Sequence, residues 1–282
     1  MPIIFTSGSC LKNELFDIII AAMVSAGWEN VSSLASSDFI VMKSTGVNSD
    51  KSLCFQIRAT NTSNTNSVIS TDYCTASLRF IDTYIPGDTG VAGTVGRISA
   101  GWWNLPIVPV VNTTTLSGAT TLNYKLYTDK NRVMVAIEYP PATGYSPLFW
   151  MIGLPDTVQV PETGNKGLIF ATTSYATTSA NIYINDNPDG LGSAAAAYAM
   201  PTYTVLSPKN PNNANKYAMS EVYYGSTTEG IRGTVDGVYL LPITNSLTGD
   251  IIEVGAEEYY TLICQSYGSN SFSSLGLAIR TL

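Results

Sequence analysis

The chain has no histidine, and only 12% of its 282 residues are Asp, Glu, Lys or Arg. Histidine is the one side chain whose ordinary pKa lies near neutral pH, which makes it the commonest general base, proton shuttle and metal ligand. Its absence excludes Ser-His-Asp and Cys-His nucleophile systems and most zinc sites. The composition therefore predicts a protein that is not an enzyme and that needs no metal and no cofactor.

Charge of either sign is also scarce, with 14 basic and 21 acidic residues and a net charge of −7. An average soluble domain has about a quarter of its residues charged. A surface this neutral is expected where partner subunits cover much of it, although a monomer rich in Ser, Thr and Asn has the same composition. The basic residues are scattered along the chain, so we expect no nucleic acid as a partner.

Cysteines are few and widely separated, and Cys10, Cys54, Cys74 and Cys264 form no Cys-x-x-Cys pair. This spacing argues against a zinc site and against a secreted scaffold dense in disulfides. We expect free, buried thiols in a reducing compartment, with a Cys54–Cys74 bridge as the alternative. No apolar run reaches about 18 residues, and no segment has a basic start followed by an apolar stretch. The sequence thus predicts no membrane span, no signal peptide and synthesis in a cytoplasm.

One amphipathic helix is expected near the N-terminus, over residues 11–26, where apolar residues recur at helical spacing. Ser7 or Ser9 is a candidate cap for its start. Gly27 supplies the left-handed residue that ends a helix, and Trp28 just beyond it is placed to fold back as in a Schellman ending. We expect this helix to pack on the protein's own sheet rather than on a partner.

Beyond Gly27 the apolar residues recur with a period of two, which is typical of antiparallel strands. The first strands read as a half-buried meander, the segment 132–139 alternates most clearly, and the almost wholly apolar 148–154 predicts burial on both faces. A tight turn is expected at 128–131. The expected strands are 38–43, 53–58, 73–81, 122–127, 132–139, 148–154, 180–184, 237–242, 250–254, 259–266 and 275–282.

These elements predict a mainly β protein of the α+β type, with antiparallel sheets or a sandwich, one N-terminal helix and long irregular loops. We divide it into residues 1–155, the helix and a β core; residues 156–218, a loop-rich insertion; and residues 219–282, whose strands complete the core. The Gly- and Pro-rich segment 84–109 reads as an irregular excursion. It lacks the Gly-Lys-Ser/Thr ending of a phosphate-binding loop.

Aromatic side chains provide the candidate interaction site. The adjacent Trp102 and Trp103 lie beside a Gly-rich stretch, where they read either as a core anchor or as an interface hot spot. The tyrosines of the 156–218 region add polar aromatic surface. The candidate interface or ligand platform is therefore Trp102, Trp103, Tyr175, Tyr183, Tyr198 and Tyr203.

Two chemical alternatives are weaker. The stretch 185–190 begins like a calcium loop, but position 196 is alanine where a bidentate glutamate is needed, so an Asx-type turn is favoured. A glycoside hydrolase needs two carboxyl groups beside one sugar, and nothing in the sequence brings two candidates together. Those candidates are Glu138, Glu162, Glu221, Asp250 and Glu253.

Three groups of segments resemble structural proteins of tailed bacteriophages and prophages. The first group is AGW at 26–28 with DFIVMKSTG at 38–46. The second is NYKLY at 123–127, KNRVMV at 130–135 and FWMIGLP at 149–155. The third is GDIIEV at 249–254, YY at 259–260 and LAIR at 277–280. None of these segments is a catalytic signature.

The resemblance implies a non-enzymatic virion component of the tail, neck or baseplate, made in the host bacterial cytoplasm and located in the virion. It implies a symmetric homo-oligomer that also contacts other virion proteins. The alternative is a capsid decoration protein, or a protein that binds a host glycan or receptor through the aromatic platform. A carbohydrate-active enzyme is the third hypothesis.

Overall fold

The structure is a computed structural model that describes part of the chain. The described residues are 4–32, 39–50, 52–59, 74–88, 91, 93–96, 98, 103–106, 119–139, 147–153, 157–158, 167–172, 183–186, 197–199, 219–226, 230–241, 246–264 and 275–281. Within them the protein is mostly antiparallel β-sheet with one α-helix near the N-terminus, as predicted.

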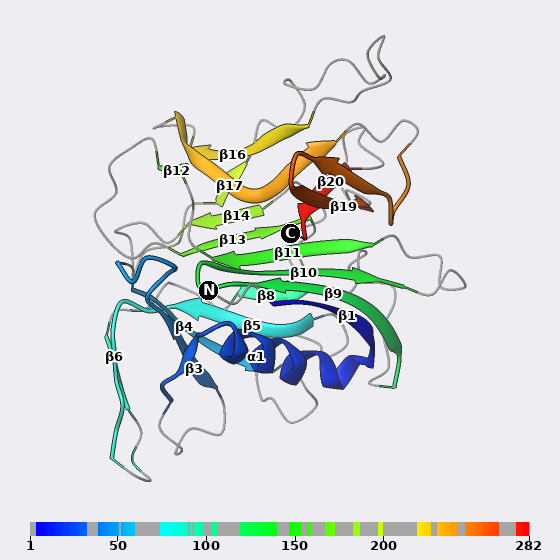
Figure 1. Ribbon diagram of the computed structural model, residues 1–282. Coiled ribbons are helices and arrows are strands. Elements are labelled where there is room, and N and C mark those ends of the chain that lie inside the picture. The colour runs from blue at the N-terminus through cyan, green and yellow to red at the C-terminus, as the bar shows by residue number, and fades with distance from the viewer. Residues whose placement is uncertain are drawn as a thin grey trace.

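The architecture is a stack of three layers around a central sheet (Figure 1). The central sheet has seven antiparallel strands in the order β1 (Ile4–Leu11), β9 (Thr121–Thr128), β10 (Arg132–Glu138), β11 (Leu148–Gly153), β13 (Leu168–Ala171), β14 (Tyr183–Asp186) and β15 (Ala197–Ala199).

The helix α1 (Leu15–Ser25) and a five-stranded sheet cover one face of the central sheet. This second sheet has the order β2 (Glu29–Asn30), β3 (Ile40–Ser44), β4 (Leu53–Ala59), β5 (Cys74–Phe80) and β8 (Trp103–Pro106). Its outer side carries the two-stranded hairpin β6 (Tyr84–Ile85) and β7 (Thr94–Val95).

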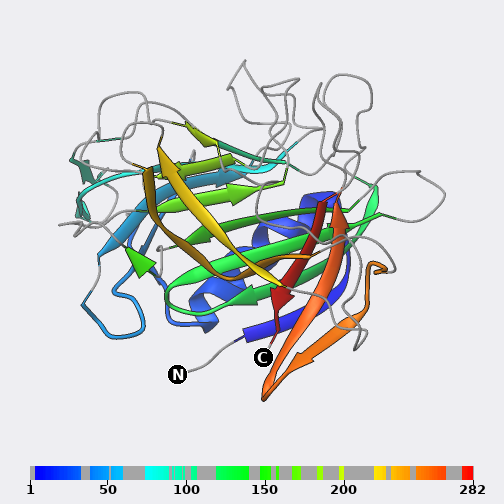
Figure 2. The same cartoon turned by 90° about the horizontal axis from the view of Figure 1, so that it is seen from above.

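A six-stranded sheet covers the other face of the central sheet. Figure 2, the view from above, shows its orange and red strands crossing the green central strands. The order is β12 (Thr157–Val158), β17 (Gly230–Leu241), β20 (Leu275–Arg280), β19 (Glu257–Cys264) and β18 (Ile251–Val254), and β16 (Ser220–Ser226) also pairs with β17.

The central strands are apolar on both sides because each side faces its own core. Along β10, Val133 and Val135 enter the core shared with α1 and the five-stranded sheet, whereas Met134 and Ala136 enter the core shared with the six-stranded sheet. All six residues of β11 are buried, which confirms the burial predicted for this segment. We call the core shared with α1 and the five-stranded sheet the helix-side core, and the core shared with the six-stranded sheet the carboxy-side core. Each removes apolar surface from water and so stabilises the stack.

The helix begins later than predicted. Leu11 is still part of β1, paired with Thr121 of β9, and a 3₁₀ turn (Lys12–Glu14) follows it. Ser7 and Ser9 lie within β1, so neither caps the helix. The apolar spacing does not distinguish a strand that leads directly into a helix from an earlier helix start.

The end of the helix is a Schellman motif, as predicted. Gly27 has φ +97°, and its N–H donates to the carbonyl of Val24 at 3.0 Å. The N–H of Trp28 donates to the carbonyl of Met23, also at 3.0 Å. These are the two hydrogen bonds that define the motif. Trp28 and Met23 are both buried in the helix-side core, so the helix packs on its own sheets.

The first meander is more buried than predicted. A half-buried meander leaves Gln56 of β4 on a solvated face, but Gln56 is buried, whereas the burial of Cys54 agrees with the expectation of buried thiols. Cys54 packs with Val41 and Ile81 in a small third cluster beneath the β6–β7 hairpin. The β6–β7 hairpin that covers this cluster belongs to the segment expected to be irregular. The pattern within β4 alone therefore does not reveal that the outer face of β4 is covered.

The segment 156–218 contributes strands to two layers: β13, β14 and β15 extend the central sheet, and β12 joins the six-stranded sheet. The division into a core, an insertion and C-terminal strands stays a prediction. The described part of 84–109 likewise includes the short strands β6, β7 and β8.

Cys10, Cys54 and Cys264 are free and buried, so the alternative Cys54–Cys74 bridge does not form. Burial raises the pKa of Cys10 and of Cys54 to about 11 and that of Cys264 to about 12. Among the helices that the structure describes, none is long and apolar enough to cross a membrane.

Candidate functional site

The turn between β9 and β10 is closed by the side chain of Asp129. Its Oδ1 accepts hydrogen bonds from the backbone N–H of Asn131 at 2.6 Å and of Arg132 at 3.0 Å. An aspartate that bonds its own following backbone is typical of an Asx turn. The predicted turn at 128–131 is therefore confirmed, and its acid has a local structural role.

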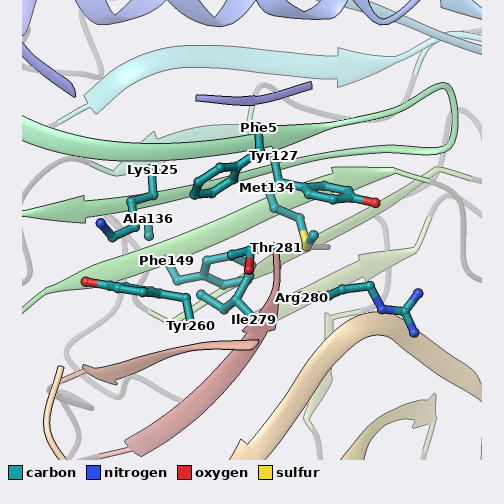
Figure 3. Close-up of a pocket in the computed structure, with 10 residues that line it drawn as sticks. All are labelled: Phe5, Lys125, Tyr127, Met134, Ala136, Phe149, Tyr260, Ile279, Arg280 and Thr281. Atoms are coloured by element: carbon teal, nitrogen blue, oxygen red, sulfur yellow. The ribbon is translucent and has the colours of Figure 1, made fainter. Parts of the chain in front are cut away.

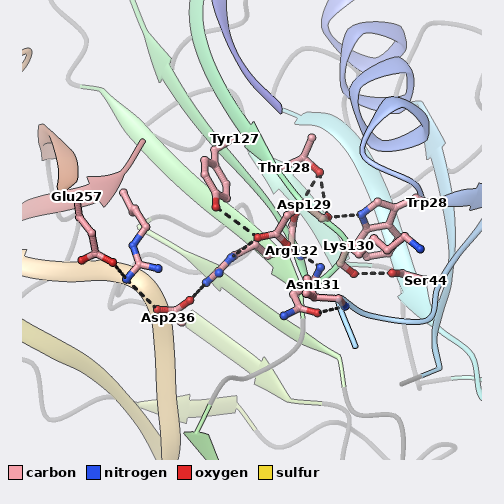
Figure 4. A network of polar contacts seen from close by, with 12 residues as sticks. Trp28, Ser44, Tyr127, Thr128, Asp129, Lys130, Asn131, Arg132, Asp236 and Glu257 are labelled. Carbon is pink, nitrogen blue, oxygen red and sulfur yellow. Dashed lines mark hydrogen bonds and ion pairs between the residues drawn. The ribbon is translucent and has the colours of Figure 1, made fainter. Parts of the chain in front are cut away.

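From this turn, Arg132 reaches the six-stranded sheet (Figure 4). Its Nε lies 3.2 Å from Asp129 Oδ2, and its Nη1 pairs with Asp236 of β17. Asp236 also faces Arg280 Nη2 at 3.7 Å, and Arg280 pairs with Glu257 at 2.9 Å. Burial alone lowers the pKa of Arg132, but the two carboxylates raise it above its ordinary value, so the side chain stays charged.

The same turn is bonded to the opposite layer. Trp28 Nε1 donates to the carbonyl of Asp129 at 2.6 Å, and Ser44 Oγ donates to the carbonyl of Lys130. The backbone N–H of Val47 donates to Asn131 Oδ1 at 2.9 Å. The turn clamp, residues 129–132 with these partners, thus joins all three layers (Figure 4). Because its charges already pair with one another, it suits stability rather than catalysis.

A small hollow lies between the central sheet and β19–β20 (Figure 3). Tyr260 OH donates to Glu138 Oε1 at 2.5 Å, while Lys125 Nζ lies 4.3 Å from the centre of the Tyr260 ring and 4.0 Å from Glu138. Burial, and then the bonded Glu138, raise the pKa of Tyr260, so its hydroxyl stays protonated at neutral pH. The residues that line the hollow are Phe5, Lys125, Tyr127, Met134, Ala136, Phe149, Tyr260, Ile279, Arg280 and Thr281.

This hollow opens beside β1, which is the edge of the central sheet. Of the strands that the structure describes, β1 pairs with β9 alone, in a register without a bulge. Lys12 N–H donates to the carbonyl of Thr120 at 2.9 Å in the same register, so even-numbered residues of β1 bond with β9. The odd-numbered residues direct their N–H and C=O groups outward. This row is the open edge.

The open edge has none of the usual protective features of an edge strand. Residues Ile4–Leu11 include no charged residue and no proline. Phe5 is 44% exposed and Leu11 41% exposed, and Ser7, Gly8 and Ser9 between them are exposed as well. Natural proteins protect edge strands with charges, proline or bulges because an open edge is a template for another strand. We therefore take the open edge as the candidate interaction site.

The predicted aromatic platform is spread over two sheets. Trp103 lies in β8 of the five-stranded sheet, while Tyr183 and Tyr198 lie in the adjacent strands β14 and β15 of the central sheet. The positions Trp102, Tyr175 and Tyr203 lie outside the described residues. The platform stays a prediction.

The candidate carboxylates lie on different elements. Glu138 ends β10 and is engaged by Tyr260, Glu221 is in β16, and Glu253 is in β18. Asp250 Oδ2 accepts the N–H of Leu247 at 2.8 Å in the turn before β18. Glu162 lies outside the described part of the chain.

The described residues contain no group of three or more His, Cys, Asp or Glu that could hold a metal ion. Asn185 and Asp186, the start of the calcium-loop resemblance, lie in β14 and pair with β13.

Sequence reasoning missed β1, and with it the open edge. Its stretch Thr6–Ser9 is rich in Ser and Gly, which have low strand propensity. The one signal in the sequence is a run of eight residues, Ile4–Leu11, with neither charge nor proline. No protein-family model and no curated protein matches the sequence.

Proposed function

We propose that this chain is a non-enzymatic structural protein that assembles into a symmetric multimer through the open edge of β1. The observation that carries the proposal is an uncharged, bulge-free edge strand with exposed Phe5 and Leu11. Such an edge offers a row of backbone hydrogen bonds to a further strand. A stable body with an open edge fits an assembly unit better than a catalyst.

The rest of the molecule supports this role. The central sheet is fixed between two cores, and the turn clamp bonds all three layers. An assembly unit needs this rigidity because a mobile body loses more entropy when it is built into a larger structure. The low charge of the chain, at 12%, also suits a surface that is largely covered by neighbours.

The proposed assembly is a bacteriophage virion, with the chain in its tail, neck or baseplate, made in the host cytoplasm. The short segments that resemble virion structural proteins support this assignment; they are 26–28, 38–46, 123–127, 130–135, 149–155, 249–254, 259–260 and 277–280. In the structure these segments include β3, β9, β10, β11, β18, β19 and β20, so the similar residues lie in all three layers.

The test is to purify phage particles from the bacterium that makes the chain, by density gradient, and to quantify the chain by mass spectrometry. We expect it to co-sediment with the particles at a constant copy number relative to the major capsid protein. Gold-labelled antibodies should mark the tail or neck. A chain that stays at the top of the gradient in every preparation contradicts the assignment.

The second candidate is a capsid decoration or host-glycan-binding protein. The expected aromatic platform of Trp102, Trp103, Tyr175, Tyr183, Tyr198 and Tyr203 is the reason to test it. Binding to a glycan array that is lost in Trp102→Ala but kept in Trp28→Phe favours this candidate. Antibody labelling of the capsid surface instead of the tail favours decoration.

A further inference from the structure

We infer that two copies of this chain pair antiparallel through β1, around a two-fold axis at Gly8, so that their two central sheets become one continuous sheet. The inference deepens the proposed function, on which it rests, by naming the occupant of the open edge as a second copy. Each chain contributes the same strand, as a two-fold interface requires.

The hydrogen-bond pattern fixes which residues of β1 are available. Along β9, the N–H of Asp129 donates to the carbonyl of Arg132 at 3.0 Å, so odd-numbered residues of β9 bond with β10. Even-numbered residues of β9 therefore face β1, in agreement with the Lys12–Thr120 bond. The outward groups of β1 belong to Phe5, Ser7, Ser9 and Leu11.

The pleat then limits the register. Opposite residues in an antiparallel pair lie on the same face, so an odd-numbered residue must face an odd-numbered residue of the other copy. Two registers use most of the strand. One places Phe5 opposite Leu11 and Ser7 opposite Ser9, with Gly8 on the axis. The other places Phe5 opposite Ser9, with Ser7 on the axis.

The first register fits the side chains better. It brings Phe5 and Leu11, the two exposed large apolar residues of β1, directly opposite each other, so both lose contact with water. The small residues Ser7, Gly8 and Ser9 leave the middle of the interface free of bulky groups. In the second register Phe5 faces a serine, and Leu11 has no opposite residue within β1.

The backbone bonds are compatible with this register. Ser7 of one copy and Ser9 of the other can exchange a pair of N–H···O=C bonds. The Phe5 N–H of one copy can donate to the Leu11 carbonyl of the other. The Leu11 N–H already donates to Glu14 Oε2 at 2.8 Å. The Glu14 side chain must therefore turn aside before Phe5 of the other copy can come opposite Leu11.

Charge favours the open edge over other surfaces as the place where two copies meet. Each chain has a net charge of −7, so two copies repel one another on average. The open edge is a neutral strip of eight residues where no like charges meet. The strand also matches itself in the first register, where Phe5 faces Leu11 and the residues between them are small, as the pairing of two identical strands requires.

The experiment measures the mass of the full chain by sedimentation equilibrium. We expect the wild-type protein to be a dimer or a multiple of a dimer. Ser7→Glu with Ser9→Glu places like charges opposite each other and should raise the dissociation constant by about tenfold or more. Ser7→Glu with Ser9→Lys should restore the dimer, because each new carboxylate then faces a new ammonium group.

The two double variants are matched. Both lose the Ser9 Oγ–Asn123 bond of 2.6 Å, and both keep the glutamate beside Lys125 of β9. A further control, Ile85→Glu with Val91→Glu, adds the same charge at exposed apolar positions outside β1 and should leave the mass unchanged. Circular dichroism and the urea midpoint show that each variant is folded.

Three results overturn the inference. These are a wild-type protein that is monomeric at all concentrations, a Ser7→Glu, Ser9→Glu variant with unchanged mass, and a Ser7→Glu, Ser9→Lys variant that does not regain the dimer. A monomer that multimerises only with other particle proteins also overturns it, since a foreign strand then occupies the edge. Co-sedimentation with particles in any of these cases leaves the assignment to a virion standing, whereas a charge-sensitive dimer absent from particles removes only that assignment.

Discussion

Arg132 provides a buried polar contact between the central and the six-stranded sheet. It is 9% exposed and lies between Asp129 of its own turn and Asp236 of β17. A buried ion pair is a weak stabiliser when compared with a well-packed apolar pair. Removing one partner has a much larger effect, since it leaves a buried charge without compensation. The importance of Arg132 therefore lies in the two acids that depend on it.

We predict that Arg132→Met lowers the free energy of unfolding by about 3–5 kcal/mol, because Asp129 and Asp236 lose their shared cation. Urea unfolding followed by circular dichroism measures this. Lys125→Met is the control: its pair with Glu138, 4.0 Å apart and partly exposed, should contribute less than about 1 kcal/mol. Equal losses in the two variants would show that the turn clamp has no special role.

The end of α1 shows how one element is joined to the next. Gly27 adopts φ +97°, and a Cβ added there meets Lys130 Cε at 2.7 Å. The backbone strain is fixed by the Schellman motif, whereas the contact is with the flexible end of a side chain. The two contributions can therefore be separated by a second substitution.

We predict that Gly27→Ala lowers the free energy of unfolding by about 1–2 kcal/mol, the typical cost of a left-handed conformation for a residue with a Cβ. Adding Lys130→Ala removes the contact but not the strain, so it should recover only a small part of this loss. Thermal or urea unfolding of the single and double variants decides the matter. Recovery of most of the loss would show that the contact, not φ, dominates.

Elements with strong local patterns could be predicted from the sequence. The segments 132–139 and 148–154 are observed as β10 and β11 because their apolar residues continue along both faces. The helix end could also be predicted, since Gly27 and Trp28 specify it locally. In contrast, β1 has a weak local pattern and becomes a strand only by pairing with β9, more than a hundred residues away.

The candidate site has the same non-local origin. No property of Ile4–Leu11 alone shows that it lies at the edge of a sheet, because that position depends on the order of all seven strands. The cover over Cys54 depends similarly on the distant β6–β7 hairpin, whose Tyr84 and Val95 pack against the cluster of Cys54. The sequence could predict the class of fold, whereas the site requires the topology.

At the scale of the whole molecule, the central sheet belongs to both cores. Alternate residues of β10 and β11 enter the helix-side core and the carboxy-side core, so neither core can lose its packing without exposing one face of the same strands. The turn clamp adds polar contacts across the same stack. We therefore expect the three layers to unfold as one cooperative unit.

Leu262→Ala tests this cooperativity. Leu262 is fully buried in the carboxy-side core, so its truncation should cost about 2–5 kcal/mol. In a Trp102→Phe, Trp103→Phe background, fluorescence reports Trp28 and Trp150 of the helix-side core. Alkylation followed by peptide mass spectrometry reports Cys264 of the carboxy-side core.

We predict that both signals change at one urea concentration and that Leu262→Ala lowers both midpoints by the same amount. Leu247→Ala, at a position that is 70% exposed, should shift neither. Alkylation of Cys264 at lower urea than the fluorescence change would mean that the six-stranded sheet opens by itself. Coincident transitions follow only if removing the isopropyl group of Leu262 on one side of the central sheet also destabilises the core on the other side, as shared strands require.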